Sequence, residues 1–242
     1  MKNQLFFEKM LVEDAKIDIL AKNINKKEEK FRGFVKSEIE VNNQLSKKLN
    51  RRVGKYFTFN FTNYNITLLQ KEIAKTISLL LGNNTENLLI VGLGNRFVAS
   101  DSLGENTIAS IKSDVKKFCP SVKSLTNIES TVVVKGIVQS IKPDAIIVID
   151  SLATLDITKL ACSIQITDAG IIAGGGVGSS SKLYSTKTMG VKVIAVGVPL
   201  IVNLASKVGV NAFLCPHQID IYVNKVSKIL SKSIDLLVLN KF

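Results

Sequence analysis

The sequence is poor in residue types on which several common enzyme chemistries depend. Its 242 residues include one histidine, three cysteines and no tryptophan. The cysteines, Cys119, Cys162 and Cys215, are an odd number at wide spacing, which is typical neither of a disulfide framework nor of a zinc site. His217 lies far along the chain from any glycine-flanked serine, so a Ser-His-Asp triad is not favoured. The scarcity of histidine and the absence of H-E-x-x-H or C-x-x-C spacing also disfavour a catalytic zinc.

Long apolar runs are also missing. The longest runs reach about eight to ten residues before Gly, Asp or Lys interrupts them, whereas a membrane-spanning helix needs roughly 20. Residues 1–10 lack the uninterrupted apolar stretch and the small-residue cleavage site of a secretory signal. We therefore expect a cytoplasmic protein without a membrane partner.

The chain carries a formal net charge of +12, but its basic residues are spread along the sequence. One cluster stands out, formed by Lys47, Lys48, Arg51, Arg52 and Lys55. Charge runs are usually solvated surface, so a nucleic-acid partner is not expected. A basic surface could still attract an acidic protein substrate.

The distribution of apolar residues predicts one main domain. Residues 1–50 are rich in Lys, Glu and Asn and are expected to form a peripheral N-terminal segment, followed by a single domain over residues 51–242. The predicted strands cover residues 53–61, 88–91, 145–149, 163–167 and 192–196. The predicted helices cover residues 66–81, 103–118, 132–141 and 218–239, with another that begins at residue 200. Strands alternating with helices predict a three-layer α/β/α fold with a mostly parallel central sheet.

Two glycine-rich segments do not match cofactor motifs. In a dinucleotide-binding turn, the third glycine after Gly92 and Gly94 would stand where this chain has Phe97. The run that contains Gly174, Gly175 and Gly176 lacks the Lys-Ser/Thr pair of a phosphate-binding loop. We expect no cofactor, and we interpret this run as a flexible active-site loop or a clamp of backbone amides.

Three aspartates follow apolar strands and are the best candidates for chemistry. Asp101, Asp150 and Asp168 would share one crevice if their strands ended at the same edge of a parallel sheet. Like charges in one crevice raise one pKa, so that an acid stands beside a base and can activate water and protonate a leaving amine. Each aspartate could instead cap a helix, and the three could hold a metal ion, although no metal is expected.

Several sequence blocks resemble the germination protease family of spore-forming bacteria. The blocks are residues 54–58, 91–95, 100–104, 142–144, 149–153, 164–170, 174–178 and 193–199. The resemblance implies an α/β/α endopeptidase that degrades small acid-soluble spore proteins during germination. It further implies a tetrameric assembly in the spore core and a zymogen with a removable N-terminal propeptide.

The resemblance also implies which residues act. Asp101 and Asp150 match the two catalytic aspartates of the family, with Gly94, Asn95, Asp168 and the residues 174–176 in support. The chain departs from the family in residues 96–100, in residues 170–176, where a His is missing, and in a shortened segment between residues 202 and 215. Two alternatives are open: a hydrogenase-maturation-type endopeptidase, which shares the opening G-x-G-N motif, and a non-catalytic relative that binds spore proteins.

Overall fold

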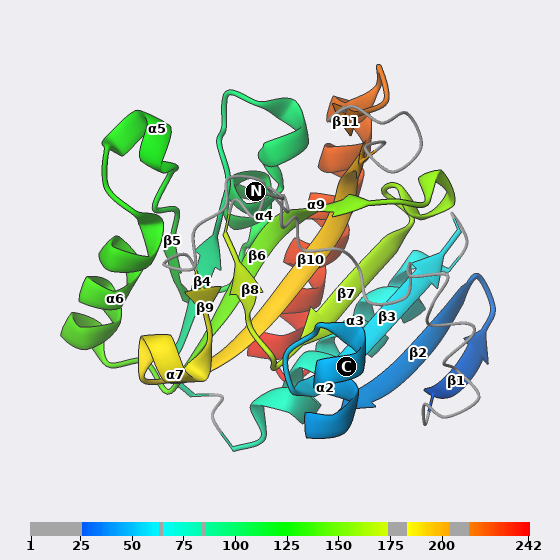
Figure 1. The fold of residues 1–242 in the computed structure, drawn as a ribbon, viewed down its shortest axis with the longest axis horizontal. Helices are drawn as coiled ribbons and strands as arrows, with labels where there is room; N and C mark the ends of the chain where they lie inside the picture. Colours follow the sequence, from blue (N-terminus) through cyan, green and yellow to red (C-terminus); the bar gives the residue numbers. More distant parts are fainter. Residues whose placement is uncertain (1–25, 63–64, 84–85, 174–182, 204–212) are drawn as a thin grey trace.

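A nine-stranded sheet forms the centre of the molecule (Figure 1). The computed structural model describes residues 26–62, 65–83, 86–173, 183–203 and 213–242. Along the sheet the strand order is β1-β2-β3-β7-β10-β6-β4-β5, and β11 pairs with β10. The strands are β1 (Lys26–Phe31), β2 (Phe34–Val41), β3 (Gly54–Phe61), β4 (Leu88–Gly92), β5 (Lys116–Phe118), β6 (Ala145–Thr154), β7 (Ser163–Thr167), β10 (Lys192–Asn203) and β11 (Phe213–Leu214).

Helices cover both faces of this sheet. They are α2 (Asn43–Leu49), α3 (Ile66–Leu81), α4 (Leu103–Ser110), α5 (Lys123–Thr126), α6 (Ser130–Ile141), α7 (Thr186–Met189) and α9 (Ile219–Val238), with short 3-10 turns η3 (Ala99–Asp101) and η4 (Ile157–Lys159). The helices α3, α4 and α9 pack against one face, whereas α6, α7, α2 and a small hairpin of β8 (Ile171–Ile172) and β9 (Leu183–Tyr184) lie over the other (Figure 1). The three-layer α/β/α expectation is confirmed.

The parallel part of the sheet occupies the half that ends at β5. Strands β10, β6, β4 and β5 run parallel to one another, and β4 and most of β6 are buried, as strands covered on both faces must be. By contrast, β7 is antiparallel to both of its neighbours, β10 and β3, and β1 to β3 are antiparallel as well. The sheet is therefore mixed, with its parallel strands at the edge where α4 and α6 connect them.

Two predicted helices differ from the structure. The helix expected over residues 103–118 ends at Ser110, and residues 116–118 form β5 instead. The helix expected from residue 200 is wrong, because β10 continues to Asn203 alongside an equally extended β6. Pro199 is tolerated at an irregularity in the pairing of these strands, as expected for a residue without a backbone N–H.

The N-terminal residues that the structure describes extend the central sheet. Strand β2 pairs with β3 along its whole length, and α2 packs on the same strands through Leu49. Residues 26–49 are thus continuous with the domain expected to begin at residue 51. Residues 1–25, the first half of the N-terminal segment expected to contain any removable propeptide, and residues 174–176 lie outside the described residues. Within the part of the chain that is described, no helix has both the length and the apolar character needed to cross a bilayer.

Replacement of Ile147 by alanine tests the central packing. Ile147 in β6 is 0% exposed and lies between β4 and β10, so Ile147→Ala should lower the free energy of unfolding by about 2–5 kcal/mol. Urea unfolding measures the change. Val132→Ala on α6, where Val132 is 63% exposed, is the control and should stay within about 0.5 kcal/mol of the parent. Equal effects of the two substitutions would contradict this description of the core.

Candidate active site

The strand order creates a topological switch point at the carboxyl end of β4, next to β6. From β4 the chain passes through α4 to β5 on one side of β4, and from β5 through α6 to β6 on its other side. The helices α4 and α6 lie on opposite faces of the sheet. In open α/β sheets, ligands bind at such a switch point, because the loops after the two strands diverge there.

Asp150 lies within β6, which continues to Thr154, beyond the strand end expected at residue 149. Its side chain is 5% exposed. Because side chains alternate along a strand, Asp150 faces the same side of the sheet as Val148 and Leu152. The backbone N–H of Ser151 donates to Asp150 Oδ1 at 2.8 Å. The sheet thus keeps the Asp150 carboxyl group almost entirely out of water, and the Ser151 N–H is the backbone donor that reaches it among the described residues.

Asp101 reaches this switch point from the loop after β4. It ends the short turn η3 and is half-buried. The backbone N–H of Asn95 donates both to the Asp101 carbonyl oxygen at 3.0 Å and to Asp101 Oδ2 at 2.9 Å. The Asn95 side chain instead accepts from the Phe97 N–H at 3.0 Å. Asn95 therefore supports Asp101 through its backbone, while its side chain shapes the loop.

Two glycines allow the loop to close this tightly. Gly94 has a φ of +111°, and a Cβ there would lie 1.9 Å from the Asp101 carbonyl oxygen. A Cβ on Gly104 would lie 2.3 Å from the Leu93 carbonyl oxygen, so the first turn of α4 packs directly against the end of β4. The Leu93 N–H donates to the Ile149 carbonyl at 2.8 Å, which ties the loop to the residue before Asp150.

The environment raises the pKa of both carboxyl groups. Burial raises the pKa of Asp101 from 3.8 to about 6, and the Asn95 N–H opposes part of that rise. Burial also raises the pKa of Asp150 well above its usual value, and the negative charge of Asp101 adds to the rise. Two neighbouring acids with raised pKa values retain a proton at a pH where ordinary aspartates have lost theirs.

Asp168 does not join this pair. Because β7 runs antiparallel to β10, the carboxyl end of β7 lies at the opposite end of the strands from the carboxyl end of β4. Thr167 pairs with Ala195, two residues before Gly197, the partner of Asp150. Asp168 Oδ1 accepts from the Lys55 N–H at 2.7 Å and so holds the start of β3. The expectation that three aspartates meet is wrong for Asp168, because the direction of β7 was not visible in the sequence.

The candidate metal set of Asp101, Asp150 and Asp168 is consequently not assembled. Among the described residues, no group of three or more His, Cys, Asp or Glu side chains is arranged to hold a metal ion.

Sequence reasoning missed two other features near the pair. A cavity of about 500 Å³ lies on the face of the sheet to which Asp150 belongs, and its lining includes Leu152, Gln165 and Gly197. Tyr184 in β9 is fully buried and close enough to Asp150 for that charge, together with burial, to raise the pKa of its hydroxyl. The basic cluster that contains Lys47, Arg51 and Arg52 was the sequence signal for the cavity. No sequence pattern indicated a role for Tyr184.

Comparison with known proteins places the sequence in a family. A model of the germination protease family matches residues 4–209. The chain belongs to the germination protease family. The match covers both aspartates and the loop that carries Gly94 and Asn95.

Individual germination proteases are similar over most of this chain. That of Geobacillus sp. is 33% identical over 201 residues, which is 72% of this chain and 54% of the relative. The germination protease of Clostridium acetobutylicum is 32% identical, over 77% of this chain and 63% of the relative. The one from Bacillus cereus is 34% identical, over 74% of this chain and 56% of the relative. The chain thus spans between about half and two thirds of the length of these relatives.

A solved structure of a hydrogenase maturation protease is also similar to this chain. The [NiFe] hydrogenase maturation protease HycI from Thermococcus kodakarensis superposes with a TM-score of 0.41 and 12% identity, over 66% of this chain and 98% of its own.

The raised pKa values have a measurable consequence for stability. A carboxyl group whose pKa is higher in the folded than in the unfolded chain binds more protons when folded, so it costs stability as pH rises through the two values. Asp101→Asn should therefore raise the free energy of unfolding by about 1–3 kcal/mol above pH 6 and leave it nearly unchanged below pH 4.

Urea unfolding at several pH values measures this difference. Asp114→Asn is the matched control, because Asp114 is an exposed aspartate away from the crevice, and it should show no such pH-dependent gain. If Asp101→Asn destabilised the protein equally at pH 4 and pH 7, the account of this site would be wrong.

Proposed function

We propose that the chain is an endopeptidase in which Asp101 and Asp150 together hydrolyse a peptide bond. The observation that carries this proposal is the pair of buried carboxyl groups with raised pKa values at the switch point of the sheet. Family membership supports a peptidase, and the pair supplies a general acid and a general base without a histidine or a cofactor.

The two environments suggest different roles for the two carboxyl groups. Asp150 is the more buried of the two, and burial together with the charge of Asp101 raises its pKa well above the usual value, so we place the shared proton on Asp150. Asp101 is half-buried and keeps a backbone donor on Oδ2, which favours its ionised form. Asp101 is accordingly the base and Asp150 the acid when the site holds one proton.

Peptide hydrolysis can be written with these two groups. Asp101 removes a proton from a water molecule, whose oxygen forms a bond to the scissile carbonyl carbon. Asp150 gives its proton to the scissile nitrogen as the C–N bond breaks, which releases a carboxyl and an amine product. Asp101 is then protonated and Asp150 ionised, and transfer of the proton between them restores the starting state.

Small acid-soluble spore proteins are the substrates we propose, with action in the spore core during germination. The support is membership of the germination protease family. A tetramer, as the resemblance implies, stays a prediction.

Substitution of either aspartate tests the catalytic proposal. Asp101→Asn and Asp150→Asn should each lower the cleavage rate of a small acid-soluble spore protein by a factor of at least about 10³, because the pair loses its acid or its base. Mass spectrometry of the products measures cleavage, and Asp114→Asn should cut at the parental rate. Binding without cleavage by the unsubstituted protein would instead favour a non-catalytic relative.

The pH profile tests the assignment of roles. Since the base must be ionised, kcat/KM should rise as pH increases through about 6, the raised pKa of Asp101. It should fall again at higher pH, where Asp150 loses its proton. Initial rates from pH 4 to pH 10 give the profile. A rate that is already maximal at pH 4 would contradict the roles proposed for the pair.

A further inference from the structure

A tyrosine hydroxyl is buried without a hydrogen-bond partner near the carboxyl pair. Tyr184 is 0% exposed, and none of the described residues forms a hydrogen bond of good geometry with its hydroxyl. Buried tyrosine hydroxyls usually have a partner, because an unpaired one costs free energy. Phenylalanine would fill the same space without that cost. Packing alone thus favours phenylalanine at this position.

The hairpin of β8 and β9 carries Tyr184 to the face of the sheet on which Asp150 lies. Tyr184 pairs with Ile171 across the hairpin, and both side chains pack with Leu152 of β6 in one buried cluster. Leu152 follows Asp150 by two residues in β6 and therefore faces the same side. Figure 1 shows this hairpin lying over the central strands.

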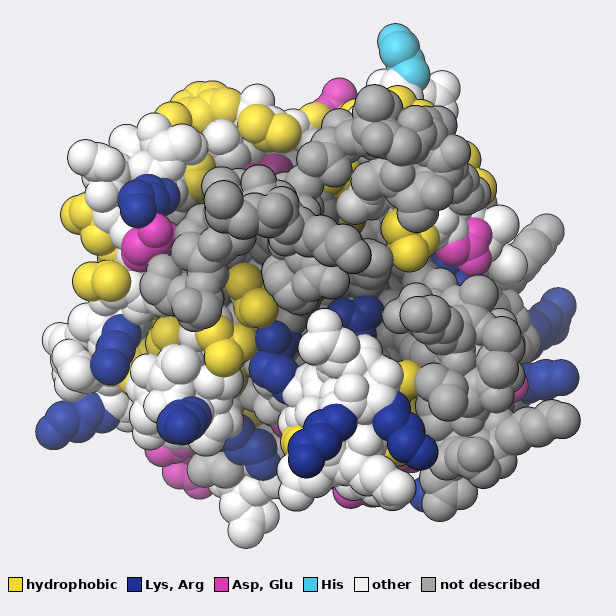
Figure 2. All heavy atoms as spheres, viewed as in Figure 1, with side chains coloured by type: hydrophobic (Ala, Val, Ile, Leu, Met, Phe, Trp, Pro, Cys, Tyr) yellow, Lys and Arg dark blue, Asp and Glu magenta, His cyan; other side chains and the backbone are white. Residues whose placement is uncertain are grey.

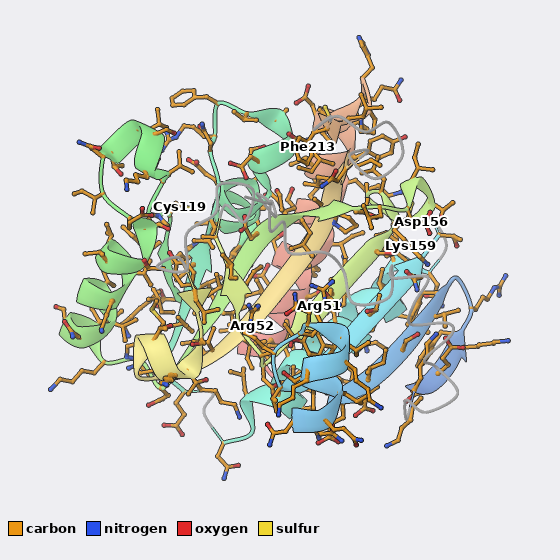
Figure 3. The ribbon with its side chains drawn as sticks, viewed as in Figure 1. Arg51, Arg52, Cys119, Asp156, Lys159 and Phe213 are labelled. Atoms are coloured by element: carbon orange, nitrogen blue, oxygen red, sulfur yellow. The ribbon has the colours of Figure 1, made fainter. Side chains whose placement is uncertain are left out.

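The start of the hairpin is held in place by Arg52, which Figure 3 shows between α2 and the central strands. Its Nε donates to the Ala169 carbonyl at 2.9 Å and its Nη2 to the Gly170 carbonyl at 2.9 Å. Gly170 has a φ of +83°, and a Cβ there would lie 2.2 Å from the Tyr184 carbonyl oxygen. Figure 2 shows hydrophobic side chains on the surface over β8 and β9. The backbone of Tyr184 is thus fixed relative to the sheet.

Three polar side chains surround the Tyr184 hydroxyl: Ser130 at the start of α6, Asp150, and Glu129. Burial raises the pKa of this hydroxyl. The Ser130 side chain opposes the rise, and the negative charges of Asp150 and Glu129 add to it. Glu129 is itself paired with Lys123 at 2.8 Å. Because its pKa is raised above the usual 10.0, the hydroxyl keeps its proton and can donate a hydrogen bond over the pH range of the reaction.

Asp150 becomes such an acceptor during the proposed reaction. When it gives its proton to the scissile nitrogen, it changes from a neutral acid to a carboxylate. The Ser151 N–H donates to Oδ1, and a carboxylate can accept several hydrogen bonds. Hydrogen bonds to a charged acceptor are stronger than those between neutral groups. A neighbouring donor therefore stabilises ionised Asp150 more than protonated Asp150.

We propose that Tyr184 is a positioning residue, which donates a hydrogen bond to Asp150 as Asp150 loses its proton. The inference rests on the proposed function. The proton that leaves Asp150 goes to the scissile nitrogen, and Tyr184 keeps its own. Because Tyr184 is fully buried, it acts through Asp150 and not by contact with the substrate. By stabilising the carboxylate, the hydroxyl makes Asp150 a stronger acid.

Tyr184→Phe tests this role through the ionisation of Asp150, since it keeps the ring and removes only the hydroxyl. Carbon-13 NMR of the aspartate carboxyl groups follows the titration. Asp150 should ionise about one pH unit higher in the variant, because its carboxylate has lost a donor. Asp101 should still ionise near pH 6. An unchanged titration of Asp150 would overturn the proposal.

Tyr56→Phe is the matched control. Tyr56 is also buried, at 6% exposed, but its hydroxyl donates to the Arg52 carbonyl at 2.9 Å. The charges that act on its hydroxyl are those of Arg52, Arg51 and Asp168 and do not include Asp150. Tyr56→Phe should leave the ionisation of Asp150 unchanged. Equal shifts in the two variants would contradict a specific role of Tyr184.

Replacement of Tyr184 by 3-fluorotyrosine gives a prediction of opposite sign. Fluorine makes the phenol a stronger hydrogen-bond donor while the ring and the hydroxyl stay in place. Asp150 should then ionise at a lower pH than in the parent protein. A shift in the same direction as that of Tyr184→Phe would indicate an effect of packing and would overturn the proposal.

Kinetics separate this role from the proposed function itself. With a small acid-soluble spore protein as substrate, Tyr184→Phe should lower kcat by about three- to tenfold and leave KM unchanged, because the acid is weaker. The alkaline limb of the pH profile should move up with Asp150. A lower kcat with an unmoved profile would overturn the role of Tyr184 and leave the protease proposal standing. If the parent protein cut nothing, the protease proposal would fail, whereas the NMR titrations would still decide whether Tyr184 donates to Asp150.

Discussion

The burial of two carboxyl groups at one point of the sheet is the constraint on which the rest of the site depends. Burying a lone negative charge in a strand covered on both faces costs free energy, yet Asp150 is only 5% exposed within β6. The fold accommodates it by raising its pKa and by bringing Asp101 against the same crevice. A carboxyl pair with a retained proton is thus a direct product of the strand order.

The loop after β4 is built around this pair. Gly94 and Gly104 allow the chain to turn back on itself, and the Asn95 N–H then meets both the backbone and the carboxylate of Asp101. Each of these contacts is local, within a dozen residues. A long-range hydrogen bond from the Leu93 N–H to the Ile149 carbonyl couples the loop to β6. The position of Asp101 relative to Asp150 is therefore determined by backbone geometry.

The layered fold and the closeness of Asp101 and Asp150 could be predicted from the sequence, because strands that alternate with helices favour a parallel sheet with its site near a switch point. The role of Asp168 could not, since an apolar run such as residues 163–167 does not reveal whether its strand runs parallel or antiparallel. The prediction of a helix from residue 200 was wrong for a related reason. Long-range pairing between β6 and β10 overrides local propensity there.

Counting the protons on the pair is the most direct test of this account. Carbon-13 NMR of aspartate carboxyl groups, with Asp101→Asn and Asp150→Asn used to assign the signals, follows each group from pH 3 to pH 10. The account predicts that Asp101 ionises near pH 6 and that Asp150 keeps its proton to a clearly higher pH. Ionisation of both groups near pH 4 would contradict it.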